Sequence, residues 1–231
     1  MTMKTREQVV RNVATIRAGI AEACERVGRD PASVTIVAAS KTVPAEVMRW
    51  AHEEGVNDFG ENYVKELQAR HIELPGVRWH FVGTLQTNTV HHVARLAEVV
   101  HTVEPGNAWR RLARRAAATR RTIPVLIEVD FTGHRTGVAP EELPAFADDV
   151  ATTEGVRLVG LMTLPPLPAV PEEARPFLRR LRDLRHDLVS GHPEAVELSM
   201  GMSLDYGIAV EEGATIVRIG TALFGERPPK T

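Results

Sequence analysis

Short apolar runs rich in β-branched residues alternate along this chain with longer segments whose apolar residues recur at helical spacing. The runs predict buried strands, and the longer segments predict amphipathic helices. We expect strands at residues 35–39, 58–60, 79–82, 99–102, 124–129, 157–161, 197–200 and 215–219. We expect helices between them at residues 45–54, 61–70, 87–97, 106–118, 140–152, 172–189 and 204–212.

A further amphipathic helix is predicted before the first strand. Its apolar positions are Val9, Val10, Val13, Ile16, Ile20 and Val27. Gly28 follows them and marks the end of the helix. We expect this segment, residues 1–28, to pack on the domain that follows, and packing on a partner chain is the alternative.

Eight strand–helix alternations with short loops require parallel strands joined by right-handed crossovers. The chain has 231 residues, slightly fewer than the roughly 250 typical of a (β/α)8 TIM barrel. We therefore predict an α/β protein with one such barrel as a single domain over residues 1–231. An open doubly wound sheet is the alternative. The barrel is preferred because eight strands can close without leaving an edge to protect.

Composition and charge exclude several classes of protein. The chain has 43% hydrophobic residues, 25% charged residues and a net charge of −2, which is ordinary globular composition without a basic surface for nucleic acid. No apolar run reaches the length of about 18 residues that a membrane helix needs. Cys24 is the only cysteine, which excludes an intrachain disulfide, and the nine histidines lack metal-site spacing. We expect a cytoplasmic protein without a bound metal.

Lys41 is the most informative residue, because it ends the apolar run that opens at Val34. The other lysines, Lys4, Lys65 and Lys230, lie near the termini or on a polar helical stretch. A lysine aimed from a strand end into a pocket is desolvated, which lowers its pKa and exposes a neutral amine. Such an amine can form a Schiff base with an aldehyde. A solvated lysine that opens a loop is the alternative.

Small residues follow the seventh and eighth predicted strands, where barrels often bind phosphate. Ser199-Met-Gly-Met-Ser203 and Gly220-Thr221 offer hydroxyls and unobstructed backbone N–H groups. Glycines that only permit tight turns are the alternative. Strand alternation places Arg218 on the same side as Gly220, where a phosphate or a heterocyclic ring nitrogen could pair with it. An ion pair of Arg218 with Glu61 or Asp205 remains open.

An amine, a phosphate cradle and an arginine on neighbouring walls fit one ligand with an aldehyde at one end and a phosphate at the other. Pyridoxal 5′-phosphate (PLP) has this structure. A sugar-phosphate aldolase would also use a Schiff-base lysine, but no matched acid–base pair accompanies Lys41.

Six segments support the PLP interpretation. They are Ala39-Ser-Lys-Thr-Val-Pro44, Phe59-Gly-Glu-Asn-Tyr-Val64, Trp79-His-Phe-Val-Gly-Thr-Leu-Gln86 with Asn88, Gly160-Leu-Met-Thr163, Leu198-Ser-Met-Gly-Met-Ser203 with Asp205, and Val217-Arg-Ile-Gly-Thr-Ala222 with Phe224-Gly225. In this order they resemble the pyridoxal phosphate homeostasis proteins, the YggS/PROSC family, whose barrel is similar to the N-terminal domain of alanine racemase. The resemblance runs from the first strand to Gly225.

The resemblance implies a barrel that holds PLP as an aldimine of Lys41. It places Arg218 at the pyridine nitrogen, where an arginine keeps that nitrogen unprotonated and weakens the ring as an electron sink. It implies that these further residues bind or surround the cofactor: Asn62, Ser199, Ser203, Gly220 and Thr221, with His80 and Met200 in the pocket wall.

Three positions depart from the family pattern. Val43, Thr89 and Arg135 stand where the family often has lysines that are linked to cofactor handover or to a second cofactor site. The resemblance therefore does not carry that property to this chain, although Arg135 could still bind a phosphate. The proline cluster at residues 165–171 follows the sixth strand and is interpreted as either a lid or a plain connector.

A carrier is favoured over an enzyme. A racemase needs a second base, which alanine racemase takes from a C-terminal β-domain, and only ten residues follow Thr221 here. Tyr63 and Tyr206, the only tyrosines, lie in no racemase motif. We expect a non-catalytic PLP protein that serves intracellular homeostasis and carriage, as a monomer or weak homodimer, with apo PLP-dependent enzymes as candidate recipients. A weak amino-acid racemase or lyase and a colourless scaffold protein are the alternatives.

Overall fold

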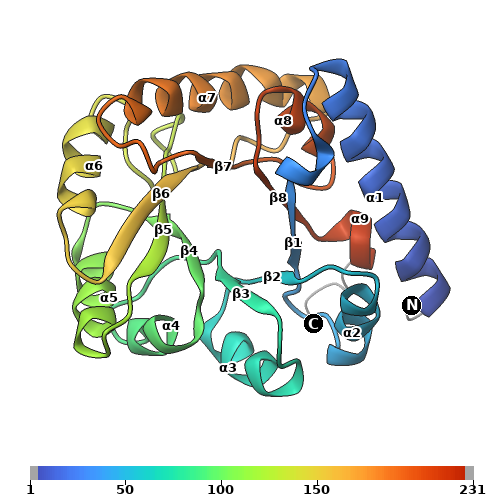
Figure 1. Ribbon diagram of the computed structural model, residues 1–231, viewed down its shortest axis with the longest axis horizontal. Helices are drawn as coiled ribbons and strands as arrows, with labels where there is room; N and C mark the ends of the chain where they lie inside the picture. The colour runs from blue at the N-terminus through green and yellow to red at the C-terminus, as the bar shows by residue number, and fades with distance from the viewer. Residues whose placement is uncertain (1–4, 227–231) are drawn as a thin grey trace.

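The barrel predicted from the strand–helix alternation is confirmed. The structure is a computed structural model and describes residues 5–226. Within them, parallel strands close into a barrel in chain order, with β1 paired to both β2 and β8 (Figure 1). The strands are β1 Thr35–Ala39, β2 Asp58–Glu61, β3 Arg78–Phe81, β4 Val99–Val103, β5 Ile123–Glu128, β6 Val156–Met162, β7 Glu197–Ser199 and β8 Ile216–Ile219.

Helices surround the strands on the outside of the barrel (Figure 1). They are α2 Ala45–Glu53, α3 Val64–Glu73, α4 Val90–Leu96, α5 Asn107–Ala118, α6 Leu143–Ala151, α7 Arg175–Val189, α8 Tyr206–Glu211 and α9 Thr221–Phe224. Short 3₁₀ turns, η1 Pro31–Ser33 and η2 Pro171–Ala174, precede β1 and α7. Several helices begin two or three residues later than predicted, because the residues before them form loops at the carboxyl ends of the strands.

The main hydrophobic core lies between the outer face of the barrel and the helices. Trp79 of β3 and Phe59 of β2 are fully buried there, with ring centroids 5.9 Å apart. Trp109 of α5 packs edge-on against Phe146 of α6 at 5.6 Å. Burial of such large side chains is the dominant favourable contribution to folding.

The helix α1, Arg6–Arg26, packs on the outside of the barrel against α2, α8 and α9 (Figure 1). Thr5 begins it with a reciprocal capping box to Gln8, which satisfies two otherwise unpaired backbone donors. Its buried apolar stripe includes most of the predicted positions, and the Asn12 amide donates to the Leu223 carbonyl at 2.8 Å. Residues 1–4 of the predicted segment lie outside the described residues.

The barrel interior has an apolar part and a polar part. The apolar part forms a small cluster separate from the main core, made of Val37, Leu126, Val159, Met162 and Ile216. The polar part consists of buried side chains that are joined by hydrogen bonds: Asp58, His80, His101, Ser199 and Arg218. An interior of this kind departs from the layers of branched apolar residues that usually fill such barrels.

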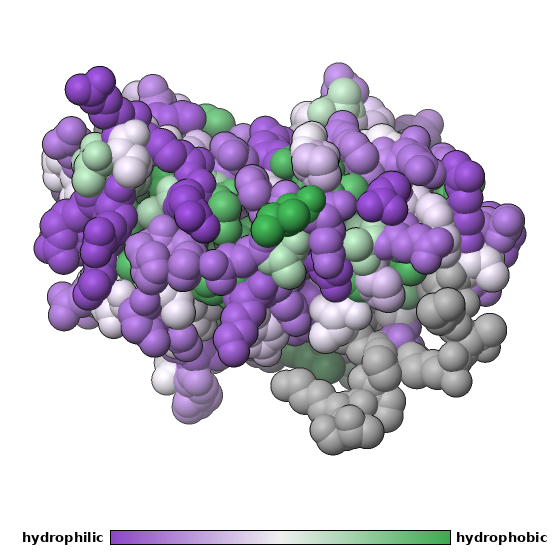
Figure 2. All heavy atoms as spheres, turned by 90° about the horizontal axis from the view of Figure 1, so that it is seen from below, coloured by the Kyte–Doolittle hydropathy of each residue, from purple (hydrophilic) through white to green (hydrophobic). Residues whose placement is uncertain are grey.

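The face of the molecule seen from below is mainly hydrophilic (Figure 2). In Figure 2 the hydrophobic side chains form small, separate spots on the face seen from below. Ile72 on α3 is 80% exposed, and isolated exposed apolar residues of this kind are ordinary. Within residues 5–226, no helix combines the length and apolar character needed to cross a membrane, and no three metal-ligating side chains come together.

Candidate functional site

A cavity of about 770 Å³ opens at the carboxyl ends of the barrel strands. Its walls come from the carboxyl ends of β1, β6 and β8 and from the residues that follow β1, β2, β3, β5, β6, β7 and β8. Six of the predicted cofactor residues line it: Lys41, Asn62, Ser203, Arg218, Gly220 and Thr221. Side chains from distant parts of the sequence therefore meet in one space, as expected for strand ends in a barrel.

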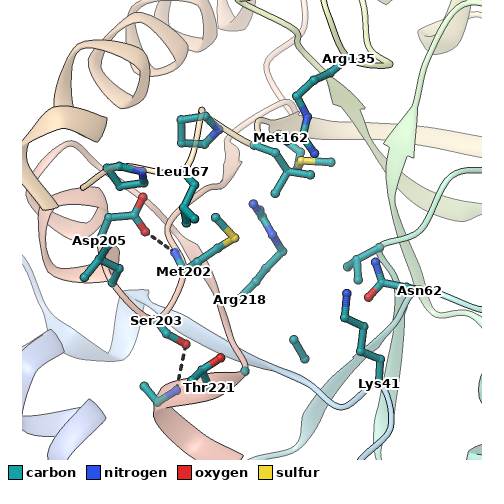
Figure 3. Close-up of a pocket in the computed structure, with 18 residues that line it drawn as sticks. Lys41, Asn62, Arg135, Met162, Leu167, Met202, Ser203, Asp205, Arg218 and Thr221 are labelled. Carbon is teal, nitrogen blue, oxygen red and sulfur yellow. Dashed lines mark hydrogen bonds between the residues drawn. The ribbon is translucent and has the colours of Figure 1, made fainter. Parts of the chain in front are cut away.

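Lys41 and Asn62 form one wall of the cavity. They follow the neighbouring strands β1 and β2, and both side chains extend into the cavity (Figure 3). Lys41 is half-buried. The next residue, Thr42, has a φ of 65°, which is strained for a β-branched residue. Strained backbone of this kind clusters at functional sites, and here it fixes the turn from which Lys41 projects.

A close backbone approach fixes the position of Asn62. Gly83, after β3, lies so near that a Cβ there would be 2.0 Å from the Asn62 carbonyl oxygen. Only glycine permits this contact. Beside it, the Ser40 hydroxyl donates to Glu61 Oε1 at 2.7 Å and joins the ends of β1 and β2. The backbone on either side of Lys41 is therefore tightly packed.

The opposite wall is a cradle of backbone N–H groups. The Ser203 hydroxyl accepts from the Ala222 N–H at 3.0 Å and ties the loop after β7 to the start of α9 (Figure 3). Asp205 Oδ1 accepts from the Met202 N–H at 2.6 Å and closes the same loop. Within residues 5–226, the backbone N–H groups of Ser203, Leu204 and Thr221 have no acceptor. Unpaired N–H groups in loops that border a cavity suit a phosphate group.

Arg218 lies between these two walls (Figure 3). Its guanidinium donates to the Ser199 hydroxyl at 2.5 Å and to the Thr163 carbonyl at 2.8 Å. Burial lowers the pKa of Arg218 to about 10, although the carboxylates of Glu128 and Asp205 oppose this shift. The side chain therefore remains a cation at neutral pH. Arg218 forms no ion pair with Glu61 or Asp205, the alternative partners that the sequence left open.

Arg135 reaches the cavity from the loop between β5 and α6 (Figure 3). Asp130 builds that loop by accepting from the Thr132 N–H and hydroxyl, at 2.9 and 2.7 Å, and from the Arg135 N–H at 3.0 Å. Burial opposes ionisation of Asp130, but these hydrogen bonds outweigh it and lower its pKa. A second cation is thereby placed at the cavity mouth.

The remaining wall is apolar. Met162 at the end of β6 lines it together with the proline-rich loop that follows. In that loop, Leu167 lies at the cavity mouth and is 84% exposed. The loop thus borders the cavity, where the sequence predicted either a lid or a connector.

Three predicted residues do not line the cavity. Ser199 points into the barrel interior beneath Arg218, and His80 lies in the same interior. Met200 alternates to the other face and is buried in the main core. Conversely, Ala39, Val82, Met202 and Leu204 line the cavity without having been predicted. They carry no chemical signal in the sequence, and only their position beside the strand ends could have identified them.

The arrangement suits a flat ligand with one electrophilic carbon and one anionic group. Lys41 supplies a primary amine on one wall, and the loop after β7 supplies anion-binding N–H groups on the other. Arg218 adds a fixed positive charge between them. The residues present therefore fit PLP, whose aldehyde, ring nitrogen and phosphate need these three partners.

Comparisons with known proteins agree with this geometry. Residues 12–228 match the family model described as alanine racemase, N-terminal domain. A pyridoxal phosphate homeostasis protein of Aquifex aeolicus is 42% identical over 213 residues, covering 90% of this chain and 93% of the relative. One from Pseudomonas aeruginosa is 41% identical and covers 95% of this chain and 96% of the relative.

The chain belongs to the family of pyridoxal phosphate homeostasis proteins. A solved member of the pyridoxal phosphate homeostasis family, PipY of Synechococcus elongatus with PLP bound, superposes with a TM-score of 0.83 at 32% identity. The match covers 94% of this chain and all of PipY. A D-threonine aldolase from Filomicrobium marinum, 16% identical with a TM-score of 0.74, shares the barrel fold.

The three departures from the family's lysine pattern have different surroundings in this chain. Val43 is half-buried and packs against the main core, and Thr89 precedes α4. Only Arg135 lines the cavity. Of the three positions, Arg135 alone can therefore contact a ligand in the cavity.

Proposed function

We propose that this protein binds PLP in the cavity, holds it as an aldimine of Lys41, and serves intracellular PLP homeostasis and carriage rather than catalysis. One observation carries the proposal: Lys41 and the N–H cradle around Ser203 and Thr221 face the same cavity from opposite walls. The family membership and the PLP-bound PipY structure support it.

Each cavity residue takes one role in this proposal. The Lys41 amine binds the aldehyde carbon, and the N–H groups of Ser203, Leu204 and Thr221 bind the phosphate. Arg218 donates to the ring nitrogen. Because an arginine keeps its protons at neutral pH, that nitrogen stays unprotonated, and carbanion chemistry on the ring is disfavoured. Asn62 and the apolar wall confine the ring.

The position of the tyrosines supports a carrier over a racemase. Racemisation needs a base on each face of the substrate. Tyr63 is 52% exposed on the surface, and the Tyr206 hydroxyl packs against Gly19 of α1. Neither lines the cavity. In the part of the chain that the structure describes, Lys41 therefore has no tyrosine opposite it.

Absorption spectroscopy with borohydride trapping tests the covalent bond. Protein loaded with PLP should show a visible aldimine band, and borohydride should fix the cofactor to the peptide that contains Lys41. Lys41→Ala should lack the band. Lys65→Ala removes an exposed lysine of α3 and is the matched control, which should keep the band. Reduction at Lys65, or an unchanged band in Lys41→Ala, would contradict the proposal.

Exchange of substrate protons separates a carrier from an enzyme. The loaded protein is incubated with alanine, threonine or lysine in deuterated water, and deuterium at Cα is followed by NMR. A carrier should give no exchange above that of free PLP. Exchange that depends on Lys41 would instead support the racemase or lyase alternative. Carriage itself predicts that the loaded protein activates an apo PLP-dependent enzyme when the two are mixed.

A further inference from the structure

A continuous line of hydrogen bonds leaves Arg218 on the side away from the cavity. The Arg218 guanidinium donates to the Ser199 hydroxyl at 2.5 Å, and the Ser199 hydroxyl lies 2.8 Å from His101 Nδ1. His101 Nε2 lies 2.8 Å from His80 Nδ1. His80 Nε2 lies 2.8 Å from Asp58 Oδ1. These four contacts join strands β8, β7, β4, β3 and β2 through the barrel interior.

The line crosses the barrel from one end towards the other. Asp58 and Arg78 are the first residues of β2 and β3, at the amino-terminal edge of the barrel. Asp58 Oδ1 also accepts from Arg78 Nε, whose side chain is 54% exposed. At the other end, Arg218 is followed by the cavity residues Gly220 and Thr221. A surface ion pair at one edge is thus connected to the floor of the cavity.

The two ends, together with the neutrality of the two buried histidines, fix the direction of every bond in the line. A guanidinium can only donate, and a carboxylate can only accept. With both imidazoles neutral, the Ser199 hydroxyl donates its own proton to His101 Nδ1. His101 then donates from Nε2 to His80, and His80 donates from Nε2 to Asp58. Both imidazoles are neutral, and both carry their proton on Nε2.

The electrostatic surroundings agree with this assignment. Burial opposes ionisation of Asp58, but hydrogen bonds from His80 and Arg78 outweigh it and lower its pKa, so the carboxylate is charged. Burial, together with the neighbouring His80 and the positive charge of Arg218, keeps the pKa of His101 well below its usual value. Burial also lowers the pKa of His80, although Asp58 opposes the shift.

We propose that Ser199, His101, His80 and Asp58 form a one-way chain of hydrogen bonds that orients Arg218 toward a ligand in the cavity. They are positioning residues, because none of them lines the cavity. The proposed role toward the cofactor ring rests on the proposed function. The direction of the hydrogen bonds does not depend on the proposed function, since it follows from the protein's own contacts.

The chain gives Arg218 a defined orientation. Its donors to Ser199 and to the Thr163 carbonyl use two of its five N–H groups. Both acceptors lie in the barrel wall, so the guanidinium plane is held at two points and its remaining donors stay available to a ligand. Loss of the Ser199 acceptor would leave a buried charged donor unpaired and free to rotate, at a cost of about tenfold or more in any binding that needs the fixed orientation.

The direct test is the tautomeric state of the two histidines in the protein without cofactor. Long-range ¹H–¹⁵N NMR on histidine-labelled protein distinguishes Nδ1–H, Nε2–H and imidazolium forms. We expect neutral Nε2–H forms for both His80 and His101 near neutral pH. Ser199→Ala should leave His101 with a mixture of tautomers. An Nδ1–H or charged form of either residue in the unsubstituted protein would overturn the proposal.

Cofactor affinity provides the second readout, measured by fluorescence titration with PLP. Ser199→Ala should weaken binding about tenfold, and Asp58→Asn, at the distant end, by a smaller factor of about three. Thr102→Val is the matched control. Thr102 neighbours His101, but its hydroxyl donates to the Gly83 carbonyl, which is not part of the hydrogen-bond chain. Loss of the Thr102 hydroxyl should therefore leave both PLP affinity and the histidine tautomers unchanged.

The two proposals fail in different ways. If the unsubstituted protein does not bind PLP, the proposed function is wrong. The tautomers of His80 and His101 still decide whether the hydrogen-bond chain exists. Thermal denaturation first shows that Ser199→Ala is folded. If the unsubstituted protein binds PLP and this folded variant binds it as tightly, the positioning role is wrong. If Asp58→Asn does not fold, the unsubstituted protein's tautomers and Ser199→Ala decide the outcome.

Discussion

Each barrel strand presents one face to the surrounding helices and the other to the barrel interior, and the two faces differ in chemistry. Outward residues such as Phe59, Trp79 and Leu198 are apolar and fully buried under the helices. The inward neighbours of the latter two, His80 and Ser199, are polar and belong to a hydrogen-bonded line. The same strands therefore carry both a packing surface and a polar network.

The difference indicates a division of labour between stability and function. Apolar contacts on the outer face are non-directional and add up with buried area. Buried polar groups instead contribute only when every donor meets its acceptor, and they then fix side-chain orientation. The outer face should therefore determine whether the barrel folds, and the inner face should determine how Arg218 meets a ligand. Substitutions of Trp79, Glu61, Thr42 and Arg120 test this division.

The largest effect is expected from Trp79→Ala on the outer face. This side chain is fully buried against Phe59, and its removal leaves a cavity that the barrel cannot close. The free energy of unfolding should fall by about 3–5 kcal/mol, measured by urea denaturation. PLP affinity of the folded variant should stay within about twofold, because the inner face is unchanged. A loss of less than about 1 kcal/mol would contradict the role assigned to the outer face.

Glu61 tests how the outer face tolerates charge. Burial raises the pKa of Glu61 to about 8, against the hydrogen bond from Ser40, and the neighbouring Glu66 raises it further. The unfolded chain loses this proton near pH 4.5. Between these pH values the folded protein binds more protons than the unfolded chain, so its stability falls as the pH rises.

Glu61→Gln remains neutral at every pH and should remove this decline. Between pH 5 and pH 8 the unsubstituted protein should lose about 3 kcal/mol more stability than the variant. Urea denaturation at both pH values gives the difference. Glu141→Gln, at an exposed position, is the control and should behave like the unsubstituted protein. A decline of equal size in Glu61→Gln would show that Glu61 is already ionised in the folded barrel.

Much of the fold could be predicted because each strand is a short apolar run with a helix behind it. The run that ends in Lys41 became β1 with the predicted bounds, and the small residues after β7 and β8 reached the cavity as expected. Helix starts were less predictable. Residues 61–63 have helical composition, yet Glu61 ends β2 and Asn62 faces the cavity before α3 begins at Val64.

The interior line of hydrogen bonds could not be predicted from the sequence. His80 and His101 are 21 residues apart, and they meet only because the register of β3 and β4 pairs His80 with Val99, two residues before His101 on the same face. Ser199 was predicted to contact the phosphate because it begins a small-residue motif. Strand alternation instead turns it into the interior, where it pairs with Arg218. Contacts of this kind depend on barrel register, which a single sequence does not specify.

The smallest effect on stability is expected at two strained residues that share a backbone conformation. Thr42 has a φ of 65°, and Arg120, after α5, has a φ of 55°. Glycine adopts this region without strain, so Thr42→Gly and Arg120→Gly should each raise the free energy of unfolding by up to about 1 kcal/mol. Thermal denaturation measures both gains.

Only one of the two substitutions should affect the cavity. Thr42 follows Lys41 directly, whereas Arg120 lies in the loop after α5, away from the cavity. Glycine at position 42 lets the Lys41 turn move, so PLP affinity should fall while stability rises, and fluorescence titration should separate the two variants. Equal affinities in both would mean that the strain at Thr42 has no part in holding the Lys41 amine, and that its position is set by the packing of Ser40 and Asn62 alone.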